Sequence, residues 1–92
     1  MNRSRLQVLY SGRVQGVGFR YQAKRIAAGF EVVGIVRNLA DGRVEIEAEG
    51  TVDELKEFLQ AVRESGLGPM IRGEAEFWSE PAGGFRGFEI VR

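Results

Sequence analysis

The residues best equipped for chemistry lie in one glycine-rich stretch, GRVQGVGFR at positions 12–20. Its glycines let successive backbone N–H groups turn into one hollow, a geometry that favours an anion. The stretch ends where a helix is expected to begin, and a helix N-terminus adds partial positive charge. Arg20 supplies a planar guanidinium that can hold two phosphate oxygens. We predict a phosphate-binding site built from the backbone amides of Gln15, Gly16, Val17, Gly18 and Phe19.

The same glycines would also suit a plain strand-to-helix connection with an exposed arginine, and the loop alone does not decide between the two. Two nucleotide-binding motifs are excluded. A Walker A loop needs a lysine followed by a hydroxyl residue, and a dinucleotide-binding loop needs a third glycine where this chain has Tyr21.

Asn38 is the second candidate, because it stands at the expected end of a strand just before a hairpin. An asparagine at such a place usually forms the turn by bonding its own backbone, and spacing alone favours that role. If the strand end lies close to the glycine-rich loop, its amide can instead accept from a water and donate to a phosphoryl oxygen.

The first half of the chain is predicted to form a strand, a helix and a strand. Apolar residues alternate over residues 5–12, as in a strand. After the loop they recur every three or four positions from Phe19 to Phe30, as on one face of a helix, with Gly29 near its end. Residues 32–39 are rich in β-branched side chains and predict the second strand, and Asp41-Gly42 marks a hairpin turn.

The second half is predicted to add a strand, a helix and a strand. Residues 44–50 alternate strictly, and we expect their three glutamates on a solvated face. Thr51 and Glu54 fit a capping box at the start of a helix that ends near residues 65–66. A fourth strand is expected over about 71–79, and residues 88–91 form either a short fifth strand or a tail on the edge. The order predicts an α+β, ferredoxin-like split βαβ sandwich (βαββαβ), with both helices on one face of an antiparallel sheet.

Length and composition limit the number of domains and exclude several kinds of site. Ninety-two residues with 43% hydrophobic and 28% charged side chains are typical of one globular domain, which we expect to span residues 1–92. Cysteine and histidine are absent, which excludes disulfides, zinc fingers and catalytic triads. No apolar run approaches the roughly 20 residues that a membrane span needs, and no secretory signal is evident. We expect a cytoplasmic protein without membrane contact.

The formal net charge is zero but unevenly spread, with +6 on residues 1–40 and −6 on residues 41–92. This asymmetry favours an anionic ligand near the first half of the chain. It argues against nucleic acid, because the acidic half would repel phosphates. An RNA-recognition sheet would also need aromatic residues on its central strands, where this chain has glutamates at positions 45, 47 and 49.

Two blocks of the sequence resemble one family. The stretch at positions 12–20 is similar to the G-x-V-Q-G-V-x-F-R signature of the acylphosphatases. The second block, Gly34 to Asn38 followed by the Asp41-Gly42 hairpin, is similar to that family's G-x-V-x-N and D-G-x-V-E segments. The likeness extends over nearly the whole chain. Two departures are Ile35, where many members have an aromatic residue, and Gly18, which occupies a free position of the signature.

The resemblance implies an enzyme that hydrolyses the carboxyl-phosphate bond of small acyl phosphates. Arg20 would bind the phosphoryl group, and Asn38 would position a water that attacks phosphorus in line. No metal and no cofactor are expected, and we expect a monomer. Two alternatives stay open, a non-catalytic anion-binding or regulatory domain of the same fold, and a module of a carbamoyl-transfer maturation factor.

Overall fold

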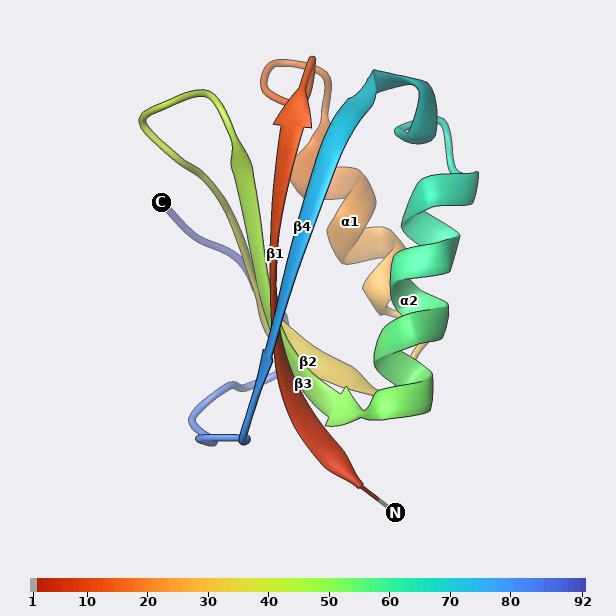
Figure 1. Ribbon diagram of the computed structural model, residues 1–92, viewed down its shortest axis with the longest axis vertical. Coiled ribbons are helices and arrows are strands. Elements are labelled where there is room, and N and C mark those ends of the chain that lie inside the picture. The colour runs from red at the N-terminus through yellow and green to blue at the C-terminus, as the bar shows by residue number, and fades with distance from the viewer. Residues whose placement is uncertain (1) are drawn as a thin grey trace.

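The computed structural model describes residues 2–92, which form a five-stranded sheet with two helices packed on one face (Figure 1). The strand order is β4-β1-β3-β2-β5. This confirms the predicted α+β, ferredoxin-like sandwich. The elements are β1 (Arg3–Gly12), α1 (Phe19–Ala27), β2 (Val32–Asn38), β3 (Val44–Thr51), α2 (Val52–Glu64), the short 3-10 helix η1 (Gly68–Met70), β4 (Ile71–Ser79) and β5 (Phe88–Ile90).

The core lies between the sheet and the helices. Alternate residues of the central strands point toward the helices, including Leu6 and Val8 of β1 and Ile46 of β3, which are fully buried. Each helix packs a stripe of buried side chains against this face of the sheet, including Ala23 of α1 and Phe58 of α2. No helix within residues 2–92 is long and apolar enough to cross a membrane.

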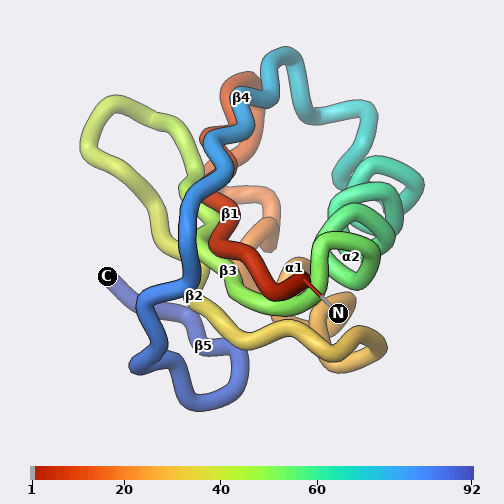
Figure 2. The backbone as a smooth tube through the Cα atoms, turned by 60° about the horizontal axis from the view of Figure 1, so that its bottom comes forward, coloured from red at the N-terminus to blue at the C-terminus, as the bar shows by residue number. Residues whose placement is uncertain are grey.

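The C-terminal residues form a true fifth strand, and it runs parallel to β2, so the sheet is mixed rather than antiparallel throughout. The reason is topological. β4 ends at the end of the sheet where β2 begins, and the chain crosses there before entering β5 (Figure 2). A strand that enters from that end must run in the same direction as its neighbour β2. The rings of Phe58 and Phe88 then pack together, with their centroids 5.5 Å apart, and this contact joins α2 to β5.

The expectation of a solvated glutamate face on β3 was wrong. Glu45 is 4% exposed and Glu49 is 3% exposed. Arg37 pairs with Glu45, while Arg5 pairs with Glu49 at 2.8 Å and with Glu47 at 3.0 Å. The chain between β4 and β5 also crosses this face, because the N–H groups of residues 82 and 83 donate to the Glu49 carboxylate. A long-range covering of this kind leaves no signal in the alternation of β3.

The capping box at the start of α2 forms only in part. The Thr51 hydroxyl accepts from the Glu54 N–H at 3.2 Å, as predicted. The Glu54 carboxylate does not reach back to residue 51 but accepts from the N–H of Glu31 at 2.7 Å. It thereby ties the first turn of α2 to the chain just before β2.

Glu49 should give the protein a measurable pH dependence of stability. Burial opposes its charge, but hydrogen bonds from the N–H groups of Ala82 and Gly83 and from Arg5 outweigh burial and lower the pKa of Glu49. A lowered pKa stabilises the fold above the ordinary glutamate range and loses that contribution as the pH falls toward the lowered value. We expect Glu49→Gln to reduce the free energy of unfolding by about 2 kcal/mol at pH 7.

Urea titrations at pH 7 and at pH 3 measure this. The gap between wild type and Glu49→Gln should shrink at the lower pH. Glu47→Gln is the matched control, because Glu47 is more exposed and pairs with Arg5 alone among its described contacts. Its loss should be within about 1 kcal/mol. Equal losses for the two variants would contradict the role given to Glu49.

Candidate active site

A hollow of about 140 Å³ lies where the glycine-rich loop, the start of α1 and the end of β2 meet. It contains both side chains that the sequence singled out, Arg20 from the first turn of α1 and Asn38 from the last position of β2. We call it the catalytic hollow, after the role proposed for it below. It is lined by Val14, Gly16, Gly18, Phe19, Arg20, Tyr21 and Asn38.

Two buried side chains hold the loop in place. Val14 is 1% exposed and Phe19 is 2% exposed, whereas the four residues between them are exposed. The Phe19 ring packs on Tyr10 of β1 with ring centroids 5.0 Å apart. Burial, with the negative charge of Glu74, raises the pKa of Tyr10 far above its ordinary value, so this ring stays neutral. The loop is therefore an exposed arch fixed at both ends in the core.

Two glycines shape the arch. Gly16 has φ of 76° and Gly18 has φ of 80°, in the left-handed region that side chains with a Cβ disfavour. Gly18 is also the N-cap of α1 and has no side chain to bond the helix's first N–H groups. Those donors at the entrance of α1 remain available to an anion.

The Gln15 side chain fixes the loop to the hairpin between β2 and β3. Its Nε2 donates to the carbonyl of Leu39 at 2.8 Å and to the carbonyl of Arg43 at 3.0 Å. Leu39 directly follows Asn38, so this contact sets the distance between the loop and Asn38. From the sequence only the backbone amide of Gln15 was expected at the site, and this role of its side chain was missed. Nothing in its spacing indicated which carbonyls the amide would meet.

Arg20 and Asn38 are both half-buried. The first turn of α1 contains no acidic residue, and Arg20 has no ion-pair partner among residues 2–92. Its guanidinium is therefore available to an anion. The register of β2 puts Asn38 on the same face as the buried Val36, which is the face toward α1.

Three of the five residues predicted to supply backbone amides line the hollow. Gly16, Gly18 and Phe19 line it, but Gln15 and Val17 do not. Gln15 turns to the hairpin, and Val17 exposes its side chain on the other side of the loop. Tyr21 lines the hollow and was not predicted, since an exposed tyrosine in a helical pattern carries no functional signal.

Within residues 2–92, no group of three or more Asp or Glu side chains is arranged to hold a metal ion. That the reaction needs no metal stays a prediction.

Comparison with known proteins identifies the family. The family model for acylphosphatase matches residues 6–90. The chain belongs to the acylphosphatase family. The acylphosphatase of Salinibacter ruber is 41% identical over 88 residues, which cover 96% of this chain and 93% of that protein. The crystal structure of acylphosphatase from Bacillus subtilis matches with a TM-score of 0.88 at 36% identity, over 97% of this chain and 99% of that one.

The same fold also occurs inside a longer protein. Full-length HypF, in a phosphate- and nucleotide-bound crystal structure, matches with a TM-score of 0.82 at 27% identity over 99% of this chain and 12% of HypF. Identity to the Bacillus subtilis acylphosphatase is higher. The family and these relatives support an enzyme, a hydrolase that acts on small acyl phosphates.

The Gln15 contact can be tested separately from phosphate binding in this acylphosphatase. Gln15→Met keeps the length of the side chain but removes both hydrogen bonds. The two carbonyls lie in exposed surroundings, so stability should change by less than about 1 kcal/mol. We expect kcat to fall about tenfold, because Asn38 loses its fixed distance from the loop, while the affinity for inorganic phosphate changes little.

Steady-state kinetics with benzoyl phosphate, together with a phosphate titration, measure the two effects. Gln60→Met, on the exposed surface of α2, serves as the control and should behave as wild type. An unchanged kcat in Gln15→Met would show that this contact does not position Asn38.

Proposed function

We propose that Arg20 and Asn38 carry the hydrolysis of acyl phosphates in this chain. The observation that supports it is their meeting in one hollow, although they come from different elements, α1 and β2. Arg20 is proposed to hold the phosphoryl group by its planar fork, with help from loop amides between Gln15 and Phe19. The hydrolysis yields a carboxylate and inorganic phosphate.

An acyl phosphate has a good leaving group. The carboxylate that departs has a pKa of roughly 4, judged from side-chain carboxyls, so it leaves at neutral pH without being protonated. No general acid is required. The work left to the protein is positioning and the compensation of negative charge, which dominate phosphoryl transfer.

Asn38 is proposed to orient the attacking water. Its amide oxygen accepts from the water, and its amide nitrogen donates to a phosphoryl oxygen. Asparagine is not basic enough to remove the proton, so the proton passes to a phosphoryl oxygen of the substrate. Attack from the Asn38 side in line with the scissile bond sends the carboxylate away from β2.

The remaining properties are proposed on narrower grounds. We propose a monomer, since a single copy of the chain already brings Arg20 and Asn38 into one hollow and needs no second copy to complete that pair. We propose that nucleic acid is not a ligand, since Arg5 and Arg37 already pair with the outer-face glutamates. A single domain over residues 1–92, a cytoplasmic location and independence from metals and cofactors are proposed as well.

Arg20→Lys should be nearly as damaging as Arg20→Ala. A lysine brings one point charge and cannot hold two phosphoryl oxygens in the geometry of the guanidinium. We expect Arg20→Ala to lower kcat/KM for benzoyl phosphate by about 10³-fold. On a logarithmic scale, Arg20→Lys should recover no more than about a tenth of that loss, so the two variants should differ by only about twofold. Arg13→Lys, at the exposed start of the same loop, is the control. A lysine variant that keeps most of its activity would count against bidentate binding.

Asn38→Ala separates turnover from binding and tests the proposed function directly. We expect it to abolish hydrolysis of benzoyl phosphate, because the water is no longer oriented, while inorganic phosphate still binds. The assay includes EDTA and uses phenyl phosphate, an aryl monoester with a poorer leaving group, as the comparison substrate. Wild type should cleave the acyl phosphate alone, whether or not EDTA is present.

The alternative is a domain that binds an anion without turnover. Folded wild-type protein that binds phosphate but does not cleave benzoyl phosphate would establish it. Loss of phosphate binding in Asn38→Ala would instead make Asn38 a structural residue of the site.

A further inference from the structure

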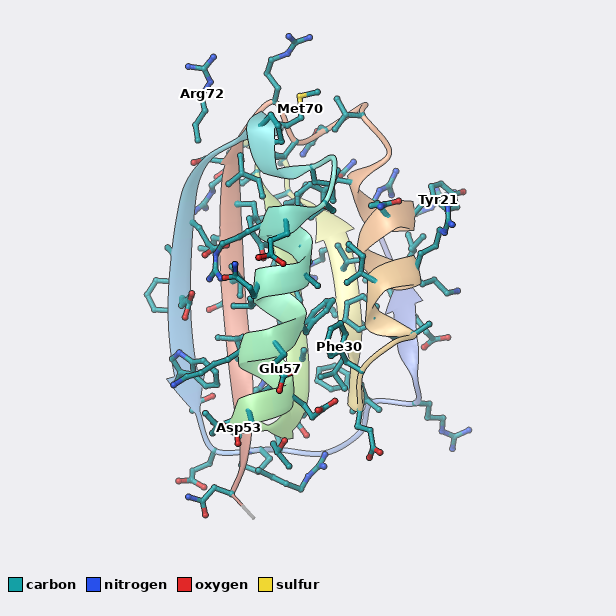
Figure 3. The ribbon with its side chains drawn as sticks, turned by 90° about the vertical axis from the view of Figure 1, so that its right-hand side faces the viewer. Tyr21, Phe30, Asp53, Glu57, Met70 and Arg72 are labelled. Carbon is teal, nitrogen blue, oxygen red and sulfur yellow. The ribbon has the colours of Figure 1, made fainter. Side chains whose placement is uncertain are left out.

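A second hollow adjoins the catalytic one on the other side of the glycine-rich loop. Its volume is about 450 Å³, and its lining includes Val17, Gly18, Tyr21, Arg25 and Leu67. Gly18 and Tyr21 also line the catalytic hollow, so these two residues border both hollows. The second hollow lies between α1 and the turn that follows α2. The start of α1, where Tyr21 stands, and the turn that leads to Met70 lie at the same end of the molecule (Figure 3).

The catalytic hollow is the smaller of the two. Its volume is about 140 Å³, against about 450 Å³ for the second hollow. A phosphoryl group at Arg20 and a water at Asn38 both draw on the smaller space, and the acyl part of the substrate extends from it.

The direction of departure points to the second hollow. Asn38 lines the catalytic hollow and does not line the second one. In-line attack from Asn38 places the leaving carboxylate on the opposite side of phosphorus. The second hollow, bordered by the same Gly18 and Tyr21, is the neighbouring space on a side that Asn38 does not line.

The lining of the second hollow indicates which acyl groups fit. Val17 is 36% exposed and Tyr21 is 71% exposed, and Leu67 contributes a further apolar wall. Arg25 lies one helical turn beyond Tyr21, about 10 Å along α1 from Gly18. Within residues 2–92 its guanidinium has no ion-pair partner. The hollow thus has apolar side chains beside Gly18, a polar contribution from Gln22, and a cation at its far end.

We propose that the second hollow binds the acyl part of the substrate and that Arg25 favours acyl groups with an apolar body and an anionic far end. This inference rests on the proposed function, since it extends the substrate from the catalytic hollow. Tyr21 and Val17 contact the apolar body, and Arg25 contacts the far anion.

A pair of substrates that differ only at the far end tests it. 4-Carboxybenzoyl phosphate and 4-methylbenzoyl phosphate have similar leaving groups and shapes, but only the first carries a second anion. We expect wild type to prefer the carboxylated substrate about fivefold in kcat/KM, the size of one favourable exposed ion pair. Arg25→Gln should bring the ratio to about one, and Arg25→Lys should keep part of the preference.

Lys24→Gln is the matched control. Lys24 is exposed in the same last turn of α1 as Arg25 but does not line the hollow. Lys24→Gln therefore changes the net charge and the charge at the helix end by the same amount as Arg25→Gln, without changing the lining. The ratio should stay at its wild-type value in this variant. Circular dichroism checks that each variant is folded.

The outcomes separate this inference from the proposed function. Hydrolysis of both substrates with no preference, or a preference that survives Arg25→Gln, would overturn the acyl site and leave the phosphate chemistry intact. A preference lost equally in Lys24→Gln would also overturn it, because the effect would then be general charge attraction. Failure of wild type to cleave either substrate or acetyl phosphate would overturn the proposed function itself.

Discussion

The site depends on the burial of two side chains, Val14 and Phe19, at the two ends of the glycine-rich loop. Their burial fixes the ends of an arch whose middle residues stay exposed to solvent. Without the contact between Phe19 and Tyr10, α1 would have no fixed starting point on the sheet. The apolar core therefore fixes the position of the proposed anion site, although no apolar group has any affinity for an anion.

On the opposite face of the sheet, acidic side chains are paired with arginines. The glutamates of β3 are paired with Arg5 and Arg37 and partly covered by the chain that leads to β5. Phe85 from this covering segment also lies over the Arg5 guanidinium at 4.7 Å. The negative charge is thus compensated locally, on the face away from the helices. Arg20, in contrast, has no ion-pair partner among residues 2–92 and is available to a ligand.

The chemistry of the site fits the residues that form it. A substrate whose leaving group departs as a carboxylate asks for positioning and charge compensation rather than for proton transfer from the protein. A backbone arch, one guanidinium and one amide can supply both. Such a site has few catalytic side chains, so a side chain that sets their distances, such as Gln15, also affects the reaction without touching the substrate.

The sequence by itself determined the order of the elements, because this follows from local spacing and residue type. It also made Arg20 and Asn38 candidates, through their residue types and the two blocks that resemble one family. Only the tertiary structure decided that Asn38 reaches the hollow, that Gln15 turns to the hairpin, and that β5 runs parallel to β2. It also decided that Glu49 is buried. Each of these depends on which distant segments meet, and a pattern of local spacing contains no information about that meeting.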